Sequence, residues 1–206
     1  WISTVTTYPL ALAVVPRSPI KSFGDMVAKA KAEPNKITYS SVGIGSAMHL
    51  ATEWIQSEAG IQLNHIPFKG GTGPMTELLA GRLDVMVDTM TLTAKLVSEG
   101  RVRAIATTAL PGKSPLPGVP AVSDSYPNMV YESWLGIIAP AGTPTAIIER
   151  LNREIRAVVD MPDVRQKMID FGGQPQASSP TEFRTRVERD IANMRKVMTE
   201  RKIEQE

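Results

Sequence analysis

The segment KITYSSVGIGSAMHL, residues 36–50, decides the fold of this chain. Its first residues alternate as a short strand does, and a turn containing Gly43 and Gly45 then leads into a predicted helix over Ala47–Glu58. A strand that passes through a glycine-rich turn into a helix presents backbone N–H groups outward, and the helix dipole acts in the same direction. The segment therefore predicts a place that binds anions, with Ser46 as the cap of the helix.

The spacing of the glycines in this turn narrows the class of anion. The third glycine of the dinucleotide-binding fingerprint is missing, and so is the Gly-Lys-Ser/Thr sequence of a phosphate-binding P-loop. A small carboxylate is therefore a better ligand for the turn than a nucleotide. The spacing leaves one alternative open, an ordinary connection between strand and helix that has a serine cap and no ligand.

The same order of strand, glycine-rich loop and helix recurs between residues 36 and 108. This rhythm predicts a doubly wound α/β sheet with parallel strands, in which ligands bind beyond the carboxyl ends of the strands. Three loops are expected to meet there: Ser41–Ser46, Lys69–Thr72 and Asp88–Met90. Asp88 itself is either a turn residue or a partner for an amino group of the ligand.

The expected elements follow from apolar periodicity and from the positions of glycine and proline. Strands are predicted over 9–15, 37–40, 61–67, 83–87, 102–107 and 131–139, and helices over 23–32, 47–58, 74–80, 91–99, 144–159, 163–171 and 180–202. Thr143 and Ser179 are expected to cap the helices that follow them, each with proline at the first helical position. Only the strand 131–139 and a short one near Gln174 remain for the last helices to cover. The end of the chain therefore reads as part of a second lobe whose sheet is missing.

Composition excludes several classes of protein. The chain has 206 residues, 42 % of them apolar and 21 % charged, with a net charge of +2, so we expect a packed core. No dense basic cluster is present, and we expect no nucleic-acid partner. The absence of cysteine excludes disulfides and thiolate metal sites, no apolar run is long enough to span a membrane, and no spacing predicts a metal or a cofactor. The chain opens on Trp1 without a visible signal peptide, which we interpret as a processed or cut start.

Two other classes of function compete with ligand binding. A hydrolase or transferase would use Ser41 or Ser46 as nucleophile with His49 as base. Asp88 would complete such a triad. No Gly-x-Ser-x-Gly elbow is present to expose a serine, so we expect no enzyme and no catalytic residue, and we interpret His65 as structural. A ligand-sensing domain of a regulator shares the fold type, but the sequence contains no helix-turn-helix segment.

A series of motifs runs along the chain: YSSVGIGSAMHL (39–50), IPFKGG (66–71), LAGRLDV (79–85), GRVRAIA (100–106), LPGVP (116–120) and WLGIIAPAGTP (134–144). In this order the series resembles the tripartite tricarboxylate transporter receptor family, also called the Bug or TctC-type periplasmic solute-binding proteins. The motifs span nearly the whole chain, which makes the resemblance far more specific than one glycine-rich loop.

The resemblance implies a periplasmic-binding-protein fold of type II, with a small carboxylate held in the cleft between two lobes. The ligand would be a dicarboxylate, a tricarboxylate or an acidic amino acid, and the partners would be the membrane components of a tripartite transporter. Family members are periplasmic and bind through backbone amides, hydroxyls and ordered waters. Carried over residue by residue, the site consists of Ser41, Gly43, Gly45, Ser46, Gly70, Gly71, Thr72 and Asp88. Phe68 stands where the family usually has tyrosine, so a hydroxyl contact is lost there.

The resemblance also divides the chain into parts. Residues 1–15 would be a hinge-crossing strand region, residues 16–130 the α/β ligand-binding lobe, and residues 131–206 a crossing strand and C-terminal helices of an incomplete first domain. Family members carry a further region before the position of Trp1. The resemblance thus implies a truncated chain that binds carboxylates weakly or not at all, exposes an apolar patch on the helices after Pro144, and self-associates through this helical tail.

Overall fold

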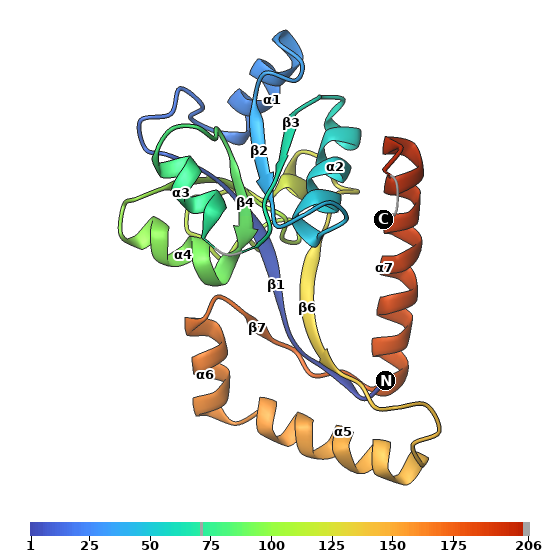
Figure 1. Ribbon diagram of the computed structural model, residues 1–206. Coiled ribbons are helices and arrows are strands. Elements are labelled where there is room, and N and C mark those ends of the chain that lie inside the picture. Colours follow the sequence, from blue (N-terminus) through green and yellow to red (C-terminus); the bar gives the residue numbers. More distant parts are fainter. Residues whose placement is uncertain (71, 204–206) are drawn as a thin grey trace. The chain divides into compact units, whose positions relative to one another are not determined.

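The computed structural model of the chain, shown in Figure 1, describes residues 1–70 and 72–203. They form two compact units. Unit 1 consists of Trp1–Tyr8 and Ser133–Lys196, and unit 2 consists of Pro9–Glu132 and the end of the chain from Val197. Strand β1 (Ser3–Val14) and helix α7 (Pro180–Arg201) each contribute residues to both units.

Unit 2 contains the recurring pattern of strand, loop and helix. Its helices are α1 (Phe23–Ala32), α2 (Ala47–Ala59), α3 (Gly73–Leu79) and α4 (Met90–Ser98). Its strands besides β1 are β2 (Thr38–Ser41), β3 (Asn64–Pro67), β4 (Met86–Thr89) and β5 (Arg103–Thr107). The predicted elements of this region are confirmed, with ends that differ by a few residues. The connection that follows β5 holds a short 3-10 helix, Val122–Asp124.

The sheet of unit 2 is mixed. Strand β2 pairs in parallel with β3, in a register that sets Tyr39 opposite His65. On its other side β2 forms a parallel bridge between Tyr39 and Val85, the residue directly before β4. Strand β1 lies between β4 and β5 and runs antiparallel to both. The parallel strands predicted between residues 36 and 108 are confirmed for β3, β2 and β4, whereas β1, which lies outside that region, separates β4 from β5.

Strand β1 is longer than the sequence predicts, because it begins at Ser3 rather than at Pro9. Thr6 and Thr7 pair with β7 (Gln174–Pro175), whereas β4 and β5 pair with residues from Leu10 onward. Pro9 lies between these two sets of pairings. Its missing N–H therefore removes no ladder hydrogen bond to these strands, and the strand continues through it.

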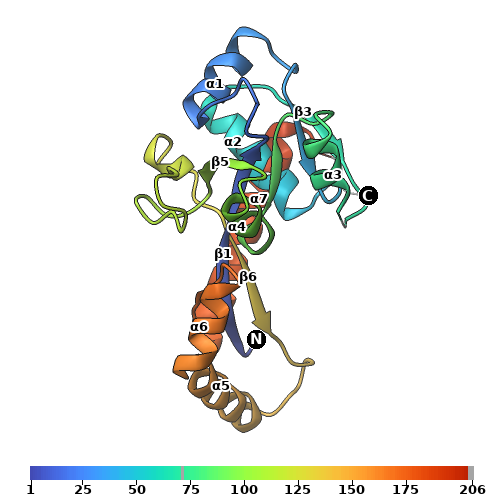
Figure 2. The same ribbon diagram turned by 90° about the vertical axis from the view of Figure 1, so that its left-hand side faces the viewer.

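Buried apolar side chains form two clusters on opposite faces of this sheet. Alternate residues of β1 separate them, since Leu12 and Val14 belong to the cluster under α1 and α2, whereas Ala13 belongs to the cluster under α3 and α4. Figures 1 and 2 show α2 and the pair α3 and α4 on different sides of the strands. Because β2, β3 and β4 run in the same direction, the helices that follow them all begin at one edge of the sheet, whichever face they cover.

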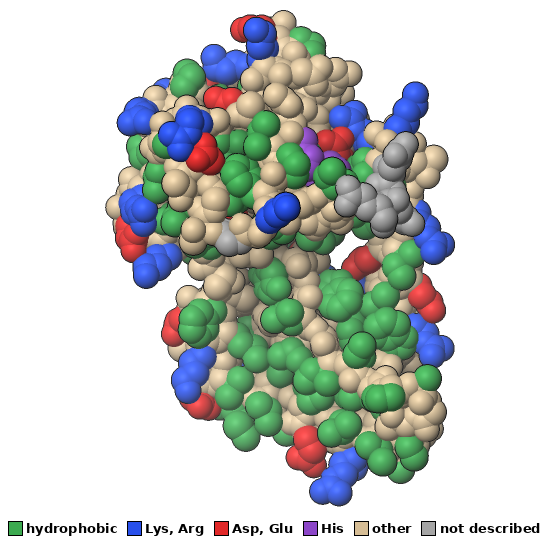
Figure 3. Space-filling model, in the orientation of Figure 1, with side chains coloured by type: hydrophobic (Ala, Val, Ile, Leu, Met, Phe, Trp, Pro, Cys, Tyr) green, Lys and Arg blue, Asp and Glu red, His purple; other side chains and the backbone are tan. Residues whose placement is uncertain are grey.

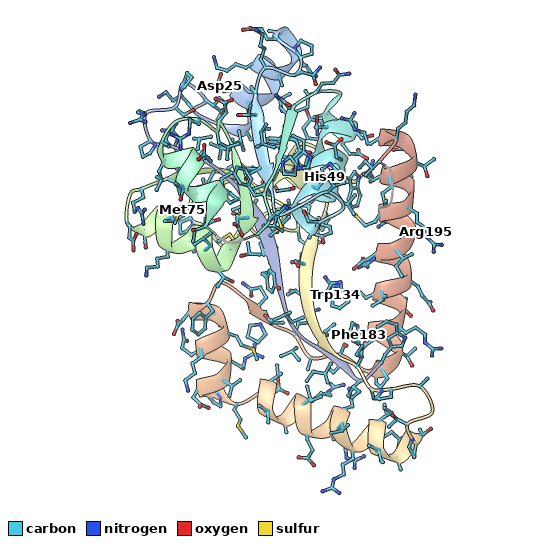
Figure 4. All side chains as sticks on the ribbon, viewed as in Figure 1. Asp25, His49, Met75, Trp134, Phe183 and Arg195 are labelled. Atoms are coloured by element: carbon cyan, nitrogen blue, oxygen red, sulfur yellow. The ribbon has the colours of Figure 1, made fainter. Side chains whose placement is uncertain are left out.

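Unit 1 combines part of β1 with β6 (Glu132–Ile137), β7 and the helices α5 (Thr145–Val159), α6 (Pro162–Asp170) and α7. Phe183 of α7 is fully buried, and its ring meets the rings of Trp1 and Trp134 edge-on at centroid distances of 5.2 and 5.1 Å. Figure 4 labels Trp134 and Phe183, which lie together between β6 and α7. The short strand predicted near Gln174 is confirmed as β7.

The predicted helix caps differ in outcome. Ser179 Oγ accepts a hydrogen bond from the N–H of Glu182, and the carboxylate of Glu182 accepts one from the N–H of Ser179, so α7 starts with a complete capping box. The prediction for Thr143 is wrong. Pro144, not Thr143, is the residue that precedes the first turn of α5, and the hydroxyl of Thr143 instead donates to the carbonyl of Pro140.

Unit 1 exposes many large apolar side chains. Phe171 is 68 % exposed and Ile138 is 64 % exposed. Others of this kind on β6, α5 and α6 and their connections are Leu135, Ile137, Ile147, Leu151, Val158, Met161 and Ile169. Figure 3 shows hydrophobic side chains gathered over this unit on the face in view. The prediction of apolar surface on the helices after Pro144 is therefore confirmed.

Candidate functional site

The three loops predicted to form the site leave the same edge of the sheet. They follow β2, β3 and β4, which are parallel neighbours, so their carboxyl ends lie side by side. The first two loops also touch, since the N–H of Phe68 donates to the carbonyl of Ser41 at 2.9 Å and a side chain at Gly43 would meet the Phe68 carbonyl. The third loop begins at Asp88 and enters α4 directly.

The first loop, Ser41–Ser46, uses its glycine amides internally. The N–H of Gly43 donates to Ser41 Oγ at 3.1 Å, and the N–H of Gly45 donates to Nδ1 of His49 at 3.0 Å. The N–H of Ser46 donates to the carbonyl of Gly43 at 3.2 Å. The N–H groups of Gly43 and Gly45 are therefore bonded within the turn and do not point outward to a ligand. Their backbones have φ angles of +135° and +75°, which glycine adopts without strain, so they shape the turn.

Other amides of the same turn remain free. Within the described residues, the N–H groups of Ile44, Ala47 and Met48 have no hydrogen-bond partner. Ala47 and Met48 are the first two residues of α2, whose N–H groups have no carbonyl to reach inside the helix. Ser46 caps this helix as predicted, although its Oγ is 3.4 Å from the N–H of His49. No acidic residue lies in the first turn of α2, so its dipole is not neutralised there.

The second loop is described except at Gly71. The prediction of Gly71 as a site residue falls outside the described residues. Gly70 has a φ angle of +71° and is partly exposed. Thr72 is exposed and precedes the first turn of α3, and its hydroxyl makes no capping bond to this helix. Lys69 is exposed. Polar groups on this loop are therefore available to a ligand.

Asp88 is a buried acid at the third loop. Its Oδ1 accepts hydrogen bonds from the N–H of Thr89 at 2.6 Å and from the Thr89 hydroxyl at 3.3 Å. Burial raises the pKa of this carboxyl, although both donors act in the opposite direction. The bonds to Thr89 agree with the turn role that the sequence allows for Asp88.

The two histidines lie against each other beneath the first loop. The rings of His49, from α2, and His65, from β3, stack with their centroids 4.0 Å apart and their planes 10° apart. His65 also stacks on Tyr39, the residue opposite it in β2, at 4.9 Å. Figure 4 labels His49 on α2. Burial lowers the pKa of His49, and burial together with His49 lowers the pKa of His65 to about 4, so both rings are neutral at pH 7.

A buried carboxylate, Glu53, lies next to the histidine pair. Its side chain accepts hydrogen bonds from the Tyr39 hydroxyl, from Gln56 Nε2 and from Arg201 Nε, each at 2.6 Å. Burial alone would raise the pKa of Glu53, but these donors outweigh it and the pKa is lowered. His49 Nε2 is 4.0 Å from the same carboxylate. Sequence reasoning missed this cluster, and the i, i+4 spacing of His49 and Glu53 on α2 is the signal that would have found part of it.

The serine–histidine arrangement differs from the triad considered above. Ser41 Oγ lies 2.6 Å from His65 Nε2, and not beside His49. Its hydroxyl also donates to the carbonyl of Gly43 and accepts the N–H of Gly43, and the side chain is completely buried. No carboxylate orients His65 in the described part of the chain, and the ring of His49 contacts Gly45 and Glu53 rather than a serine. This geometry does not favour nucleophilic chemistry.

Two findings concern metal ions and the membrane. Among residues 1–70 and 72–203 no group of histidines and acids could hold a metal ion. None of the described helices is long and apolar enough to cross a membrane.

The fold brings helix N-termini and glycine-rich loops together at one edge of a mixed sheet. Residues 1–203 match the model of the family described as "Tripartite tricarboxylate transporter family receptor", TctC. The chain belongs to this family.

The chain is similar in sequence and in fold to several known proteins. It is 32 % identical over 176 residues to the "UPF0065 protein in tcbD-tcbE intergenic region" of Pseudomonas sp. strain P51, an alignment that covers 84 % of this chain and 52 % of that protein. A solved R. palustris protein with adipate is 28 % identical, with a TM-score of 0.85, 96 % of this chain and 67 % of that chain being covered. The periplasmic binding protein BugD is 25 % identical with a TM-score of 0.84, covering 100 % of this chain and 70 % of its own. The chain thus spans about half the length of the first of these relatives.

Proposed function

We propose that the protein to which this chain belongs is a periplasmic receptor that captures a small carboxylate for a tripartite transporter, without covalent chemistry. The observation that carries the proposal is the set of unpaired N–H groups on Ile44, Ala47 and Met48. Ala47 and Met48 begin α2 and Ile44 lies in the turn before it, where the helix dipole favours negative charge. The related R. palustris protein was solved with adipate, a dicarboxylate, which supports this class of ligand.

The proposed site keeps the residues named from the family, with distinct roles for them. Ser41, Gly43 and Gly45 shape the first loop, because their polar groups bond within it. Ser46 and the amides next to it would donate to the ligand. Gly70, Gly71 and Thr72 would contribute donors from the second loop, and Asp88 would receive an amino group if the ligand carries one.

The division of the chain into functional parts is also a proposal. Residues 16–130 would form the ligand-binding lobe, residues 1–15 a crossing strand region, and residues 131–206 a crossing strand and helices of another lobe. The exposed apolar side chains of unit 1 support the proposal that further chain covers them in the whole protein. So does the length of the relatives, which exceeds the part that this chain matches. In the chain alone, the same surface would drive self-association.

A calorimetric titration tests the proposed function. Adipate, malate, citrate and aspartate are titrated into the chain at pH 7.5, with adipamide as a neutral control of the same length as adipate. We expect at least one of the carboxylates to bind saturably and the diamide not to bind, since the donors of the site favour negative charge. Binding of the diamide as strong as that of adipate, or no binding by any of these acids, would contradict the proposal.

A further inference from the structure

The two histidines of the chain form hydrogen bonds near both ends of the first loop, Ser41–Ser46. His49 accepts the N–H of Gly45 at its Nδ1 atom, and His65 contacts the Ser41 hydroxyl through Nε2 at 2.6 Å. The rings stack 4.0 Å apart, so each supports the other. The free amides of Ile44, Ala47 and Met48 lie within or directly after the segment that these bonds hold.

Hydrogen-bond accounting assigns the tautomer of His65. The hydroxyl of Ser41 has one proton to donate, and it can accept two hydrogen bonds. The carbonyl of Gly43 lies 2.9 Å from Ser41 Oγ and is an acceptor only, so the hydroxyl proton goes there. The N–H of Gly43 fills one acceptor position of Ser41 Oγ. The second acceptor position is left for a proton on His65 Nε2, which makes His65 a neutral donor.

The tautomer of His49 follows from its own partner. A backbone N–H donates to Nδ1 only if that nitrogen carries no proton, so the single proton of His49 is on Nε2. This atom faces the carboxylate of Glu53 at 4.0 Å. His49 therefore acts as an acceptor toward the loop, whereas His65 acts as a donor.

We propose that His49 and His65 are positioning residues of the carboxylate site, which as a neutral stacked pair hold Gly45 and Ser41 and so aim the free amides of the loop. This inference rests on the proposed function. Protonation of His49 at Nδ1 removes the acceptor for Gly45, and two cationic rings in this stack repel each other. Acidification therefore releases the loop and weakens carboxylate binding.

The charged and titratable groups around the pair do not cancel this effect. Glu53 faces His49 from the same helix, but Tyr39 from β2 and Arg201 from α7 already engage its carboxylate. The charge of Glu53 raises the pKa of both histidines, but burial outweighs this effect. Burial lowers the pKa of both histidines, in agreement with a neutral pair at pH 7.

Paired variants separate positioning from general stability. His49→Asn keeps an acceptor near the place of Nδ1, whereas His49→Ala removes it. We expect His49→Ala to weaken adipate binding at pH 7.5 by about tenfold, the effect of one lost hydrogen bond of the loop, and His49→Asn to restore most of the affinity. Ile55→Ala, at a fully buried core position of the same helix, is the control, and we expect it to lower stability with little change in affinity.

The pH profile tests the role of protonation. Adipate itself takes up protons in acid, so the quantity to compare is the ratio of its affinity for the natural chain to its affinity for His49→Asn. We expect this ratio to fall between pH 7 and pH 5, because asparagine does not titrate. A constant ratio, or an affinity that His49→Ala leaves unchanged, would overturn the inference.

A ligand-free measurement keeps the inference testable if the proposed function fails. Nitrogen-15 NMR of the imidazoles reports which ring nitrogen carries the proton, and the Gly45 amide resonance reports the bond to His49. We expect a neutral His49 protonated at Nε2, and a Gly45 amide that shifts and exchanges faster in His49→Ala but not in His49→Asn. A protonated Nδ1 in His49 at pH 7, or a Gly45 amide equal in all three chains, would refute the positioning role even if no carboxylate binds.

Discussion

Replacement of Ala47 by proline deletes one free donor of the candidate site without disturbing the helix. Ala47 is the first residue of α2, a position where proline fits and where its missing N–H breaks no helical bond. The preceding residue, Ser46, has φ −65° and ψ 161°, an extended conformation that a following proline favours. The variant thus removes a hydrogen-bond donor to the proposed carboxylate and changes little else.

The expected loss of affinity can be worked out from this single donor. A hydrogen bond to a charged group contributes about 1.5–3 kcal/mol, which corresponds to roughly ten- to hundredfold in Kd. Because a carboxylate shared with Ile44 and Met48 can redistribute its bonds, we expect the lower end, about tenfold. The free energy of unfolding should stay equal or rise by about 0.4–1 kcal/mol, since proline restricts the unfolded chain.

Calorimetry with adipate and urea unfolding measure the two quantities on the same samples. Thr145→Pro is the matched control, because Thr145 is the first residue of α5 in unit 1 and follows Pro144, whose ψ of 139° suits a following proline. We expect this control to leave adipate affinity unchanged. If Ala47→Pro binds adipate as tightly as the natural chain does, the free N–H at the start of α2 does not hold the ligand, and the reasoning is refuted.

Three further predictions concern stability and association. The pKa of His65 is about 4 in the folded chain and about 6.5 when unfolded, so below pH 6.5 the unfolded state binds the proton first and stability falls toward pH 4. Solvent screening of this partly exposed ring reduces the full effect to about 1–2 kcal/mol; urea unfolding at several pH values should show it, and His65→Gln should flatten the curve, whereas an equal slope in both chains would contradict the assignment. Arg201→Ala leaves the Glu53 carboxylate buried without its cation and should lower the free energy of unfolding by about 2–4 kcal/mol; Glu53→Gln added to it should recover part of this loss, and a double variant that is less stable than Arg201→Ala would speak against an unpaired charge as the cause. The exposed apolar side chains of unit 1 should make the chain associate in light scattering, and Ile138→Ser with Phe171→Ser should reduce the association; a monodisperse monomer at every concentration of the natural chain would count against the prediction.

Local signals in the sequence were sufficient for most helices and for the edge of the sheet that carries the loops. Helix α1 has the predicted ends, because Ser22 caps it and apolar residues recur with helical spacing. Gly60, in the left-handed conformation, caps the end of α2 at Ala59, one residue beyond the predicted end at Glu58. The order of strands, glycine-rich loops and helices placed all three loops beyond the ends of parallel strands, which the pairing of β2 with β3 and β4 confirms.

Long-range pairings were beyond the reach of local patterns. The antiparallel course of β1 depends on which strands flank it, and nothing in its own apolar run specifies that direction. Arg201 and Glu53 are 148 residues apart, so their contact has no local signal. The N–H groups of Gly43 and Gly45 are accepted by a serine hydroxyl and an imidazole of the same segment once the turn has formed, and the sequence alone does not show which N–H groups of the turn stay free. Glycine in such a turn indicates the shape of the backbone rather than which N–H is available.

The most direct measurement is an adipate titration followed by amide NMR on the nitrogen-15-labelled chain. The central claim is that unpaired amides at the start of α2 hold the carboxylate. It predicts that the largest downfield shifts on saturation belong to Ile44, Ala47 and Met48, with smaller shifts in the loops that follow β3 and β4. Shifts confined to unit 1, or an unchanged spectrum at adipate concentrations that saturate the calorimetric titration, would contradict the claim.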